Sequence, residues 1–466
     1  MIQLPIYEHS ANFPFSREEV WAWHARPGAI RRIMPGWEGI RPIEVGGIHN
    51  GAKTSFKISI GPIPQRWVAE HHSYIEGEQF CDNMVKGPFG RWDHAHKFLA
   101  VSDDEMTIHD HVDWKLPFHF FSRIGAPIMV MPRLKQMFKH RTRRINADMN
   151  RQAKFKDAPR KRILISGSTG LIGTQLSAFL ETDGHDVHRL LRKTSSLHPD
   201  SDKNKIVRWD DQTGEVLEGS LENFDVIIHL AGAGIGDKRW SKKRKQLIIN
   251  SRTIPTKNLS EQIAHLASPP SLFMSASAIG FYDNRGDEEL DETSSIGSGF
   301  LAETCQQWEQ STEPARSAGI RTVILRTGLV TTAAGGMLQK LLLPAKMGGM
   351  GPVGGGRQWQ SWISFDDQIY SIHHLMNQDD SEGVYNLTAP NPVTQKVYAK
   401  TLGRVLRRPA FAPIPGFMMK LLFGKMGKGL ILDGQKVHPK RLIESGYDFE
   451  HSDLESALRD TLGRFN

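Results

Sequence analysis

The chain has 466 residues, of which 39% are hydrophobic and 24% are charged, and its formal net charge at pH 7 is +8. The length predicts two to three domains, and the composition excludes a disordered or fibrous protein. No run approaches the ~18 consecutive apolar residues of a membrane helix, and the opening MIQLPIYEHS lacks a signal-peptide pattern. Cys81 and Cys305 stand far apart and outside any CxxC. We therefore expect neither a disulfide framework nor a cysteine zinc site, and we expect a cytoplasmic location.

The basic residues gather in two segments that require no nucleic-acid partner. In 135–144, KQMFKHRTRR, apolar residues recur at helical spacing, which predicts a solvated helix face. In 151–161, RQAKFKDAPRK, a proline and the lack of an apolar period predict an interdomain linker. No helix-turn-helix, zinc-finger or RNA-binding motif accompanies them, so no specific nucleic-acid partner is expected.

Residues 1–150 are expected to form an α+β domain. The strand YEHSANF is followed by a capping box from Ser16 to Glu19 that starts a first helix, and a second helix covers 29–34. Apolar residues at three- and four-residue steps predict a closing helix around 134–149. Between the helices lie five β-like runs: 54–60, 65–74, 79–85, 92–101 and 106–116. A curved sheet wrapped round a helix leaves an apolar cavity between the two.

Three stretches of this region carry a family resemblance: FPFSREEVWAWHARPGAIRRIMPGW, RWDHAHKF and HDHVDWKLPF. With them the region resembles the START-like superfamily, also called the polyketide-cyclase or SRPBCC type. The resemblance implies a helix-grip domain with a pocket for an apolar or aromatic ligand.

Four histidines on neighbouring β-like runs raise the alternative of a metal cluster. His94 and His96 share one strand face, as do His109 and His111. A hairpin that turns near 103–104 would bring both pairs onto one face, as four nitrogen ligands. The pattern HxHxF is a routine feature of domains of this kind, so hydrogen-bonding histidines and no metal are expected.

The strongest motif lies just beyond residue 161. The apolar strand 162–166, RILIS, runs directly into a glycine-rich loop and then a helical run, which is the context of a dinucleotide-binding loop. The first glycine permits the tight turn, the second lets the backbone approach the pyrophosphate, and the third allows close helix–strand packing. The helix N-terminus offers amide donors to the phosphates. The predicted contact residues are Gly167, Ser168, Thr169, Gly170, Leu171, Ile172 and Gly173.

The end of the next strand, 185–191, bears on the choice between the two nicotinamide dinucleotides. Sites that prefer NAD place an acidic side chain there to bind the ribose hydroxyls. This chain has Arg192 and Lys193 instead, two cations that suit a 2′-phosphate, although a surface basic pair is the alternative. NADP(H) is therefore the expected cofactor, and NAD(H) is less favoured.

A further apolar strand, 225–232, ends in small residues next to which a cofactor would lie close to the backbone: Leu230, Ala231 and Gly232. Downstream come SASAIGFY, FLAETCQQWE, ILRTGLV, GGMGPVGGGRQWQSWISFDD, GVYNLTAPNPVT and LILDGQKVHPKRLIESGYDF. With these motifs the chain from residue 161 onward resembles the extended short-chain dehydrogenases/reductases, and within them the atypical "epimerase family". The resemblance implies a doubly wound parallel Rossmann sheet over 162–400, a small cap over 401–466, and Ser275 among the cofactor contacts.

The resemblance also implies a serine, a tyrosine and a lysine as the catalytic groups. Ser277 matches the serine, but the Tyr-x-x-x-Lys positions hold Phe300 and Thr304, which have neither an ionisable proton nor a charge. Another acid close in sequence is one explanation, with three candidates: Tyr282, Glu303 and Cys305. Two others are cofactor binding without turnover of the usual substrates, and a sensor of redox state or of a metabolite.

Free cysteines are commonly buried, so packing within a helix is the favoured role for Cys305. Of the three explanations, we favour an NADP-dependent oxidoreductase or isomerase acting on an unknown small molecule. The alternative is a non-catalytic NADP(H)-dependent sensor or scaffold.

Arg357 is the candidate for substrate contact. It follows three glycines in GGGRQWQSWI, a pattern that favours a loop presenting a guanidinium to an acidic or phosphorylated group. The alternative is an ordinary surface loop.

Overall fold

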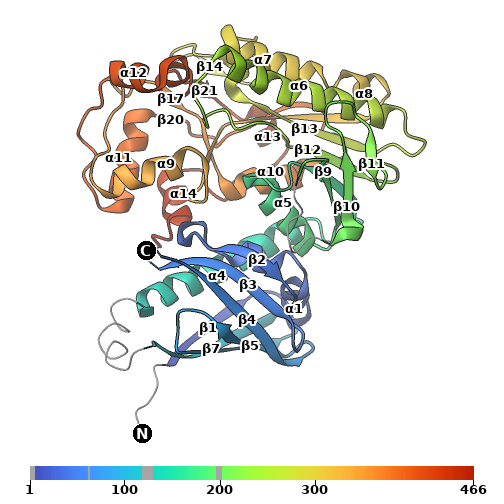
Figure 1. The fold of residues 1–466 in the computed structure, drawn as a ribbon, viewed down its shortest axis with the longest axis vertical. Coiled ribbons are helices and arrows are strands. Elements are labelled where there is room, and N and C mark those ends of the chain that lie inside the picture. Colours follow the sequence, from blue (N-terminus) through green and yellow to red (C-terminus); the bar gives the residue numbers. More distant parts are fainter. Residues whose placement is uncertain (1–5, 61–62, 118–129, 196–201, 466) are drawn as a thin grey trace.

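The computed structural model describes residues 6–60, 63–117, 130–195 and 202–465. It consists of an N-terminal unit built on an antiparallel sheet and a larger α/β unit above it (Figure 1). No helix in these ranges is long and apolar enough to cross a membrane.

The N-terminal sheet has seven strands in the order β1-β7-β6-β5-β4-β3-β2, and every neighbouring pair is antiparallel. The strands predicted from alternation are present, with boundaries moved by one or two residues. A further strand at 41–45 was not predicted. The seven are β1 (Ile6–Phe13), β2 (Arg41–Val45), β3 (Lys53–Ile60), β4 (Ile63–Ile75), β5 (Gln79–Lys86), β6 (Arg91–Ser102) and β7 (Glu105–Lys115).

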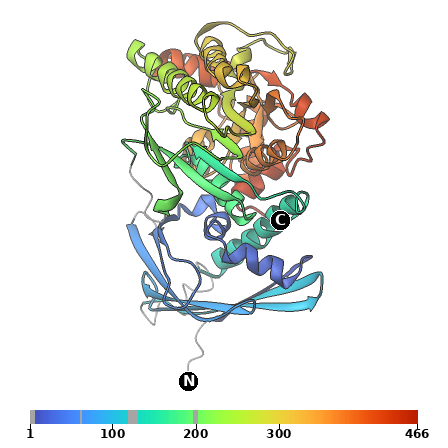
Figure 2. The same ribbon diagram turned by 90° about the vertical axis from the view of Figure 1, so that its right-hand side faces the viewer.

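Three helices cover the face of this sheet that points toward the larger unit (Figure 2). They are α1 (Arg17–Ala25), α2 (Ala29–Ile33) and the long α4 (Met131–Ala153). The predicted capping box is present, because the Ser16 hydroxyl accepts from the Glu19 amide while the Glu19 carboxylate accepts from the Ser16 amide. The core between helices and sheet includes Trp21, Trp23, Phe98, Ile108 and Met149. The sheet-and-helix arrangement matches the expected α+β domain.

The prediction that the four histidines share one face is wrong. The hairpin does turn at 103–104, but a register irregularity between Ala100 and Ser102 shifts the pairing by one residue. His96 therefore pairs with Asp110, and His94 pairs with Val112. Because a one-residue slip sends a strand's side chains to the opposite face, His109 and His111 lie on the side away from His94 and His96.

The larger unit is built on an eight-stranded sheet in the order β11-β10-β9-β8-β12-β13-β15-β19. All neighbours are parallel except β11, and the chain order reverses between β8 and β12, which is the doubly wound Rossmann arrangement. The strands are β8 (Arg162–Ser166), β9 (Asp186–Arg192), β10 (Ile206–Trp209), β11 (Val216–Glu218), β12 (Val226–His229), β13 (Leu272–Ala278), β15 (Arg321–Thr327) and β19 (Gly383–Leu387).

Helices cover both faces of this sheet. One face carries α5 (Leu171–Thr182) and α10 (Phe365–Met376), which pack on β8, β12 and β15 through Leu176, Phe179 and Ile369. The other carries α6 (Lys242–Ala264), α7 (Gly299–Gln310) and α8 (Glu313–Ser317), which lie on the far side from the N-terminal unit (Figure 1). The N-terminal unit therefore sits against the α5 and α10 face.

The remaining segments form a smaller layer beside the carboxyl ends of the strands. Its core holds Leu338, Trp362, Tyr398, Leu402 and Leu458. Its strands form three pairs: β14 (Glu289–Leu290) with β21 (Lys436–Val437), β16 (Leu329–Thr331) with β18 (Trp362–Ser364), and β17 (Trp359–Gln360) with β20 (Val393–Thr394). Its helices are α9 (Gly336–Lys346), α11 (Gln395–Leu406), α12 (Gly416–Gly427), α13 (Lys440–Glu444) and α14 (Leu454–Thr461).

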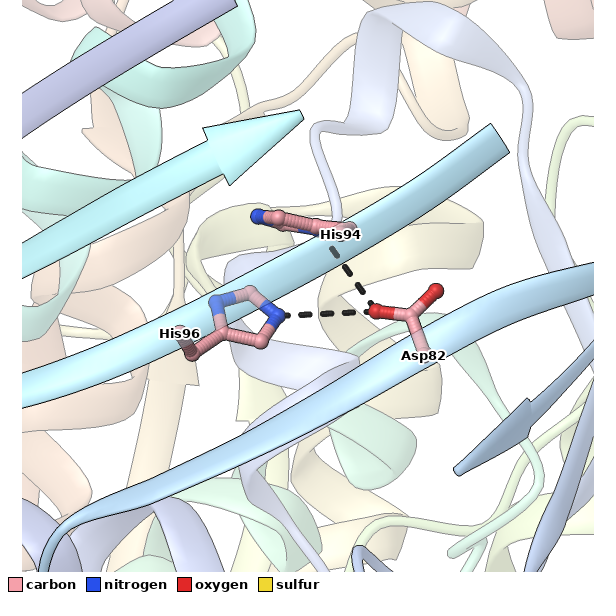
Figure 3. Close-up of side chains that lie close together, drawn as sticks. All are labelled: Asp82, His94 and His96. Carbon is pink, nitrogen blue, oxygen red and sulfur yellow. Dashed lines mark ion pairs between the residues drawn. The ribbon is translucent and has the colours of Figure 1, made fainter. Parts of the chain in front are cut away.

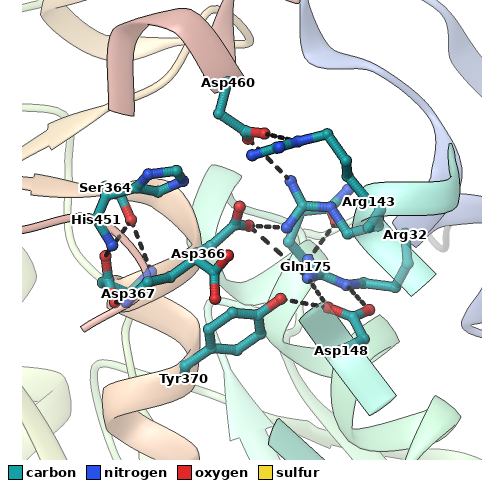
Figure 4. Close-up of polar contacts among 12 residues, drawn as sticks. Arg32, Arg143, Asp148, Gln175, Ser364, Asp366, Asp367, Tyr370, His451 and Asp460 are labelled. Carbon is teal, nitrogen blue, oxygen red and sulfur yellow. Dashed lines mark hydrogen bonds and ion pairs between the residues drawn. The ribbon is translucent and has the colours of Figure 1, made fainter. Parts of the chain in front are cut away.

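A buried ion network joins the two units (Figure 4). Arg32 of α2 donates to both carboxylate oxygens of Asp148 on α4, at 2.8 and 2.6 Å, and neither side chain is more than 1% exposed. Tyr370 of α10 donates its hydroxyl to the same carboxylate at 2.6 Å, and Arg32 also donates to Gln175 of α5 at 3.1 Å. The N-terminal unit is thus fastened to the helix that follows the glycine-rich loop.

The two basic segments differ from their predicted roles. The run 135–144 is helical, but it is not a solvated face throughout, because Arg141 and Arg144 are buried in ion pairs with Asp110 and Asp366. In the predicted linker, Arg151 is still part of α4, and its guanidinium donates to the Asp448 carbonyl at 2.7 Å.

Candidate functional site

The glycine-rich loop connects β8 to α5, and two of its glycines are required by sterics. Gly167 has a φ of +71°, a left-handed conformation that favours glycine, and a Cβ there would lie 2.8 Å from the Leu230 carbonyl carbon. A Cβ on Gly173 would lie 2.3 Å from the Gly167 oxygen. At Gly170 the nearest atom to a Cβ would be the Gly167 oxygen at 3.1 Å, so its outer side is open. The backbone can therefore be approached closely at Gly170.

Helix α5 begins at this loop without a side-chain cap, since its N-cap residue is Gly170. Amides at a helix N-terminus lack intrahelical partners and carry the positive end of the helix dipole. Thr169, Gly170 and Leu171 are all exposed. The Ser168 hydroxyl is buried, and within the described ranges it has no hydrogen-bond partner. These features fit an anionic diphosphate group at the loop.

Strand register brings the other predicted cofactor contacts to the same edge. His229 at the end of β12 pairs with Ser166 of β8 on one side and Ser275 of β13 on the other. Parallel strands end at a common edge, so the glycine loop, the segment 230–232 and the end of β13 lie next to one another. This edge lies at the point where the strand order reverses, which is where ligands bind in open α/β sheets.

Arg192 and Lys193 end β9, as predicted, but their surroundings differ from the prediction. Lys193 donates to the Asp210 carboxylate at 2.5 Å, so the residue that directly follows β10 supplies the acidic side chain that the local sequence lacks. Arg192 is exposed, and the described part of the chain offers its guanidinium no hydrogen-bond or ion-pair partner. Of the two cations, Arg192 is therefore the one available to a ligand.

A cleft of about 510 Å³ opens beside the glycine loop, between the two units. Thr169, Gly170 and Leu171 line it from one side, and Trp37 and Arg41 line it from the N-terminal unit. Residues 331–336, after β15, complete the wall. The N-terminal unit thus forms part of the surroundings of the predicted phosphate site, which the sequence did not indicate.

Ser277, the predicted catalytic serine, belongs to a buried polar cluster. Its hydroxyl donates to the Glu309 carboxylate of α7 at 2.6 Å. Arg326 of β15 holds the same carboxylate with two hydrogen bonds, of 2.8 and 2.7 Å. The charge of Arg326 compensates that of Glu309, so the serine lies against a carboxylate fixed in place. Glu309 and Arg326 were not predicted from the sequence, because each lies on a different element from Ser277.

Tyr282 does not occupy the position of a catalytic acid that reaches a ligand. Its side chain is fully buried, its hydroxyl donates to Asn386 at 2.8 Å, and Arg326 donates to it at 2.9 Å. Burial raises the pKa of Tyr282 to about 12. The tyrosine therefore acts as a hydrogen-bond acceptor that helps to hold the Arg326 guanidinium in place.

The positions of the missing tyrosine and lysine lie on α7. The Thr304 hydroxyl donates to the Phe300 carbonyl at 2.6 Å, one turn back along the helix, and Thr304 is buried. The Phe300 ring faces a cation instead, because the Lys245 ammonium of α6 lies 4.3 Å from its centroid. A lysine from another helix thus lies next to Phe300, the position that the tyrosine usually occupies. This contact could not be predicted from a local motif, because the two residues lie on different helices.

The other two candidate acids are unsuited to the role. Cys305 is buried on α7, as its packing role predicted, and burial raises the pKa of its thiol to about 12. Glu303 is exposed on the same helix.

Arg357 lies on an exposed loop directly after three glycines with positive φ. It does not line the cleft beside the glycine loop. The described residues give its guanidinium no hydrogen-bond or ion-pair partner, so it is available to a ligand at the surface of the smaller layer beside the carboxyl ends of the strands.

Comparison with known proteins gives two matches to protein families. The family described as "NAD dependent epimerase/dehydratase family" matches residues 163–388, and a domain of unknown function, DUF1731, matches residues 414–461. The epimerase family protein Mb2239 of Mycobacterium bovis is 35% identical over 296 residues, which are 64% of this chain and 96% of that protein.

Two solved structures are similar to the chain at 30% sequence identity. One is a nucleoside-diphosphate sugar epimerase from Corynebacterium glutamicum, with a TM-score of 0.79 over 98% of this chain and 90% of that one. The other is the human epimerase family protein SDR39U1 with NADPH, with a TM-score of 0.59 over 65% of this chain and 100% of that one. Since the first match covers almost all of the chain, it includes the N-terminal unit.

Proposed function

The chain belongs to the NAD dependent epimerase/dehydratase family, and from this membership we propose that it is an NADP(H)-dependent oxidoreductase or epimerase. The observation that carries the proposal is the open glycine loop at the uncapped start of α5, beside the ends of β12 and β13. The C. glutamicum relative is named a nucleoside-diphosphate sugar epimerase, so we propose sugar nucleotides as the first substrate class to test.

The preference for NADP(H) over NAD(H) is supported by Arg192. A guanidinium with no partner in the described ranges, at the end of β9, suits a 2′-phosphate. The human relative was solved with NADPH. An acidic side chain such as Asp210 would favour NAD(H), but its carboxylate is paired with Lys193 and is less available to the ribose hydroxyls.

For catalysis we propose that Ser277 and Glu309 together replace the missing tyrosine and lysine. A bound nicotinamide cofactor would supply the hydride chemistry. The Ser277 oxygen would take the proton of a substrate hydroxyl while its own proton passes to Glu309, along the hydrogen bond of 2.6 Å. Arg326 would keep this carboxylate ionised between turnovers.

This pairing predicts that Ser277→Ala and Glu309→Gln each lower kcat by about 10²–10⁴-fold, the usual contribution of general acid–base catalysis. The measurements are NADPH oxidation or NADP⁺ reduction with sugar nucleotides, aldehydes and ketones, and chromatographic detection of epimerised sugar nucleotide, because an epimerase returns the hydride to its substrate and leaves the cofactor unchanged. NADPH affinity is measured alongside. A matched control is Glu313→Gln, which alters an exposed carboxylate at the start of α8 and should leave kcat unchanged.

The outcomes separate the two candidate functions. Turnover by the wild type that survives in Ser277→Ala would contradict the proposed pair. Tight NADPH binding without turnover of any tested substrate would favour the second candidate, a non-catalytic sensor or scaffold. The observation behind that candidate is the replacement of Tyr-x-x-x-Lys by Phe300 and Thr304.

For the N-terminal unit we propose a START-like domain that binds a small ligand. A cavity of about 500 Å³ supports this proposal: the sheet and the first two helices of the N-terminal unit line it on one side, and residues of the larger unit near β9, such as Val187 and Arg189, line it on the other. Phe56, Ala69 and Phe80 line it as apolar residues, but Asp82, His96 and other polar residues line it too. A purely apolar ligand would leave these polar groups unpaired, so we expect the ligand to carry polar groups as well.

A further inference from the structure

The polar side of the N-terminal cavity holds two histidines and a carboxylate that converge (Figure 3). One oxygen of Asp82, on β5, lies 3.5 Å from Nδ1 of His94 and 3.5 Å from Nε2 of His96, both on β6. Their side chains are 16%, 11% and 7% exposed, so the group is sheltered. Asp82 and His96 line the cavity and connect the group to it.

A second carboxylate holds the opposite edge of each ring. Asp110 of β7 lies 2.5 Å from His96 Nδ1 and 3.3 Å from His94 Nε2. Arg141 of α4 donates to the same Asp110 oxygen at 2.9 Å. Each imidazole therefore lies between two carboxylates, one anchored by an arginine and one facing the cavity.

The protons cannot satisfy all four of these contacts when the rings are neutral. A neutral imidazole has one N–H, so a ring that donates to Asp110 presents a bare nitrogen lone pair to Asp82. Protonating both rings would place two positive charges side by side, because the ring centroids are 3.7 Å apart. When both rings donate to Asp110, two nitrogen lone pairs and the Asp82 carboxylate oxygen face one another, and a cation between them would resolve the conflict.

We infer that Asp82, His94 and His96 bind a divalent transition-metal ion, such as zinc or iron(II), with its open coordination positions toward the cavity. Two ligands of one four-coordinate ion with bonds of 2.0–2.2 Å lie about 3.3 Å apart, close to the observed separations. Two imidazoles and a carboxylate are a ligand set that such ions favour. Histidine ligands commonly donate their other ring nitrogen to a carboxylate, the place that Asp110 takes here.

The site would make the N-terminal unit a metal-dependent ligand-binding module. Its open positions would bind an oxygen or nitrogen donor of a small molecule held in the cavity. This inference is independent of the dinucleotide site and of the function proposed for it.

The test is a Zn²⁺ titration by calorimetry on the full chain after EDTA treatment and removal of the chelator. We expect one Zn²⁺ per chain with a Kd in the micromolar range or below, and at least a 100-fold weaker Kd in Asp82→Asn. The matched control is His109→Ala on the opposite face of the same hairpin, in which binding is expected to be unchanged. Metal binding that persists in Asp82→Asn, or that is lost in His109→Ala, would overturn the inference.

A second measurement covers the case in which Asp82→Asn fails to fold. Co²⁺ added to the metal-free wild type is expected to give visible d–d absorption typical of four- or five-coordinate nitrogen and oxygen ligands. One equivalent of Zn²⁺ should remove these bands. No such bands, and no heat with Zn²⁺, would refute the site in the unaltered protein.

Discussion

Replacing Asp148 with alanine is expected to lower the free energy of unfolding by about 3–5 kcal/mol, the usual cost of removing one partner of a buried ion pair. The substitution leaves the Arg32 guanidinium buried, with the Asp366 carboxylate 3.8 Å away as its nearest remaining counter-charge. It also takes the acceptor from the Tyr370 hydroxyl. Urea unfolding at pH 7 is the measurement.

The matched control is Asp448→Ala, which removes an exposed carboxylate paired with Lys154 at 3.3 Å. The two side chains are 78% and 44% exposed, so this change should cost less than about 1 kcal/mol. Equal effects of the two substitutions would mean that the buried Asp148 carboxylate, which binds Arg32 within the N-terminal unit and Tyr370 of the larger unit, does not stabilise the fold.

Acidification from pH 6 to pH 5 is expected to remove about 4 kcal/mol of stability through three buried histidines. Burial lowers the pKa of His24 and His140 to about 3 and that of His229 to about 4. In the unfolded chain each titrates near pH 6.5, so below that pH only the unfolded state takes up these protons. Stability is therefore complete above about pH 6.5 and falls with pH, by about 1.4 kcal/mol per pH unit for each histidine.

The change of the free energy of unfolding with pH can be measured from urea unfolding at several pH values between 5 and 6.5. His140→Leu is the informative variant, because the described residues offer its buried Nε2 no hydrogen-bond partner, so the loss of that nitrogen should cost little. The free energy of unfolding of this variant should fall less steeply with pH than that of the wild type, by about 1.4 kcal/mol per pH unit, the contribution of one proton. Stability that does not vary over this pH range would contradict the assignment of these histidines as neutral in the folded state.

The parts of the fold that the sequence predicts are those that local pattern decides. The strand 162–166, the glycines at 167, 170 and 173, and the capping box at Ser16 each rest on neighbouring residues, and the structure has all of them. Alternation likewise located six of the seven N-terminal strands. The strand Arg41–Val45 was not predicted, because its proline and charged residues break the alternation of apolar and polar residues.

Features that depend on long-range pairing could not be predicted in the same way. The irregularity near residue 101 turned His109 and His111 away and placed Asp110 beside His96. Glu309 reaches Ser277 only because α7 packs beside β13, and Asp210 reaches Lys193 only because β10 pairs with β9. Such contacts become visible once register and packing are fixed, since a slip of one residue reverses a strand's faces.

The most direct test of the dinucleotide site is a calorimetric titration with NADPH, NADP⁺, NADH and NAD⁺, using the wild type, Arg192→Ala and Gly170→Val. We expect micromolar binding of the phosphorylated pair by the wild type, at least tenfold weaker binding of that pair in Arg192→Ala, and loss of all four in Gly170→Val. Gly349→Ala, where a Cβ would meet its nearest atom only at 3.5 Å, should bind as the wild type does. No binding of any dinucleotide by the folded wild type would contradict the assignment of the glycine loop, and the proposed function with it.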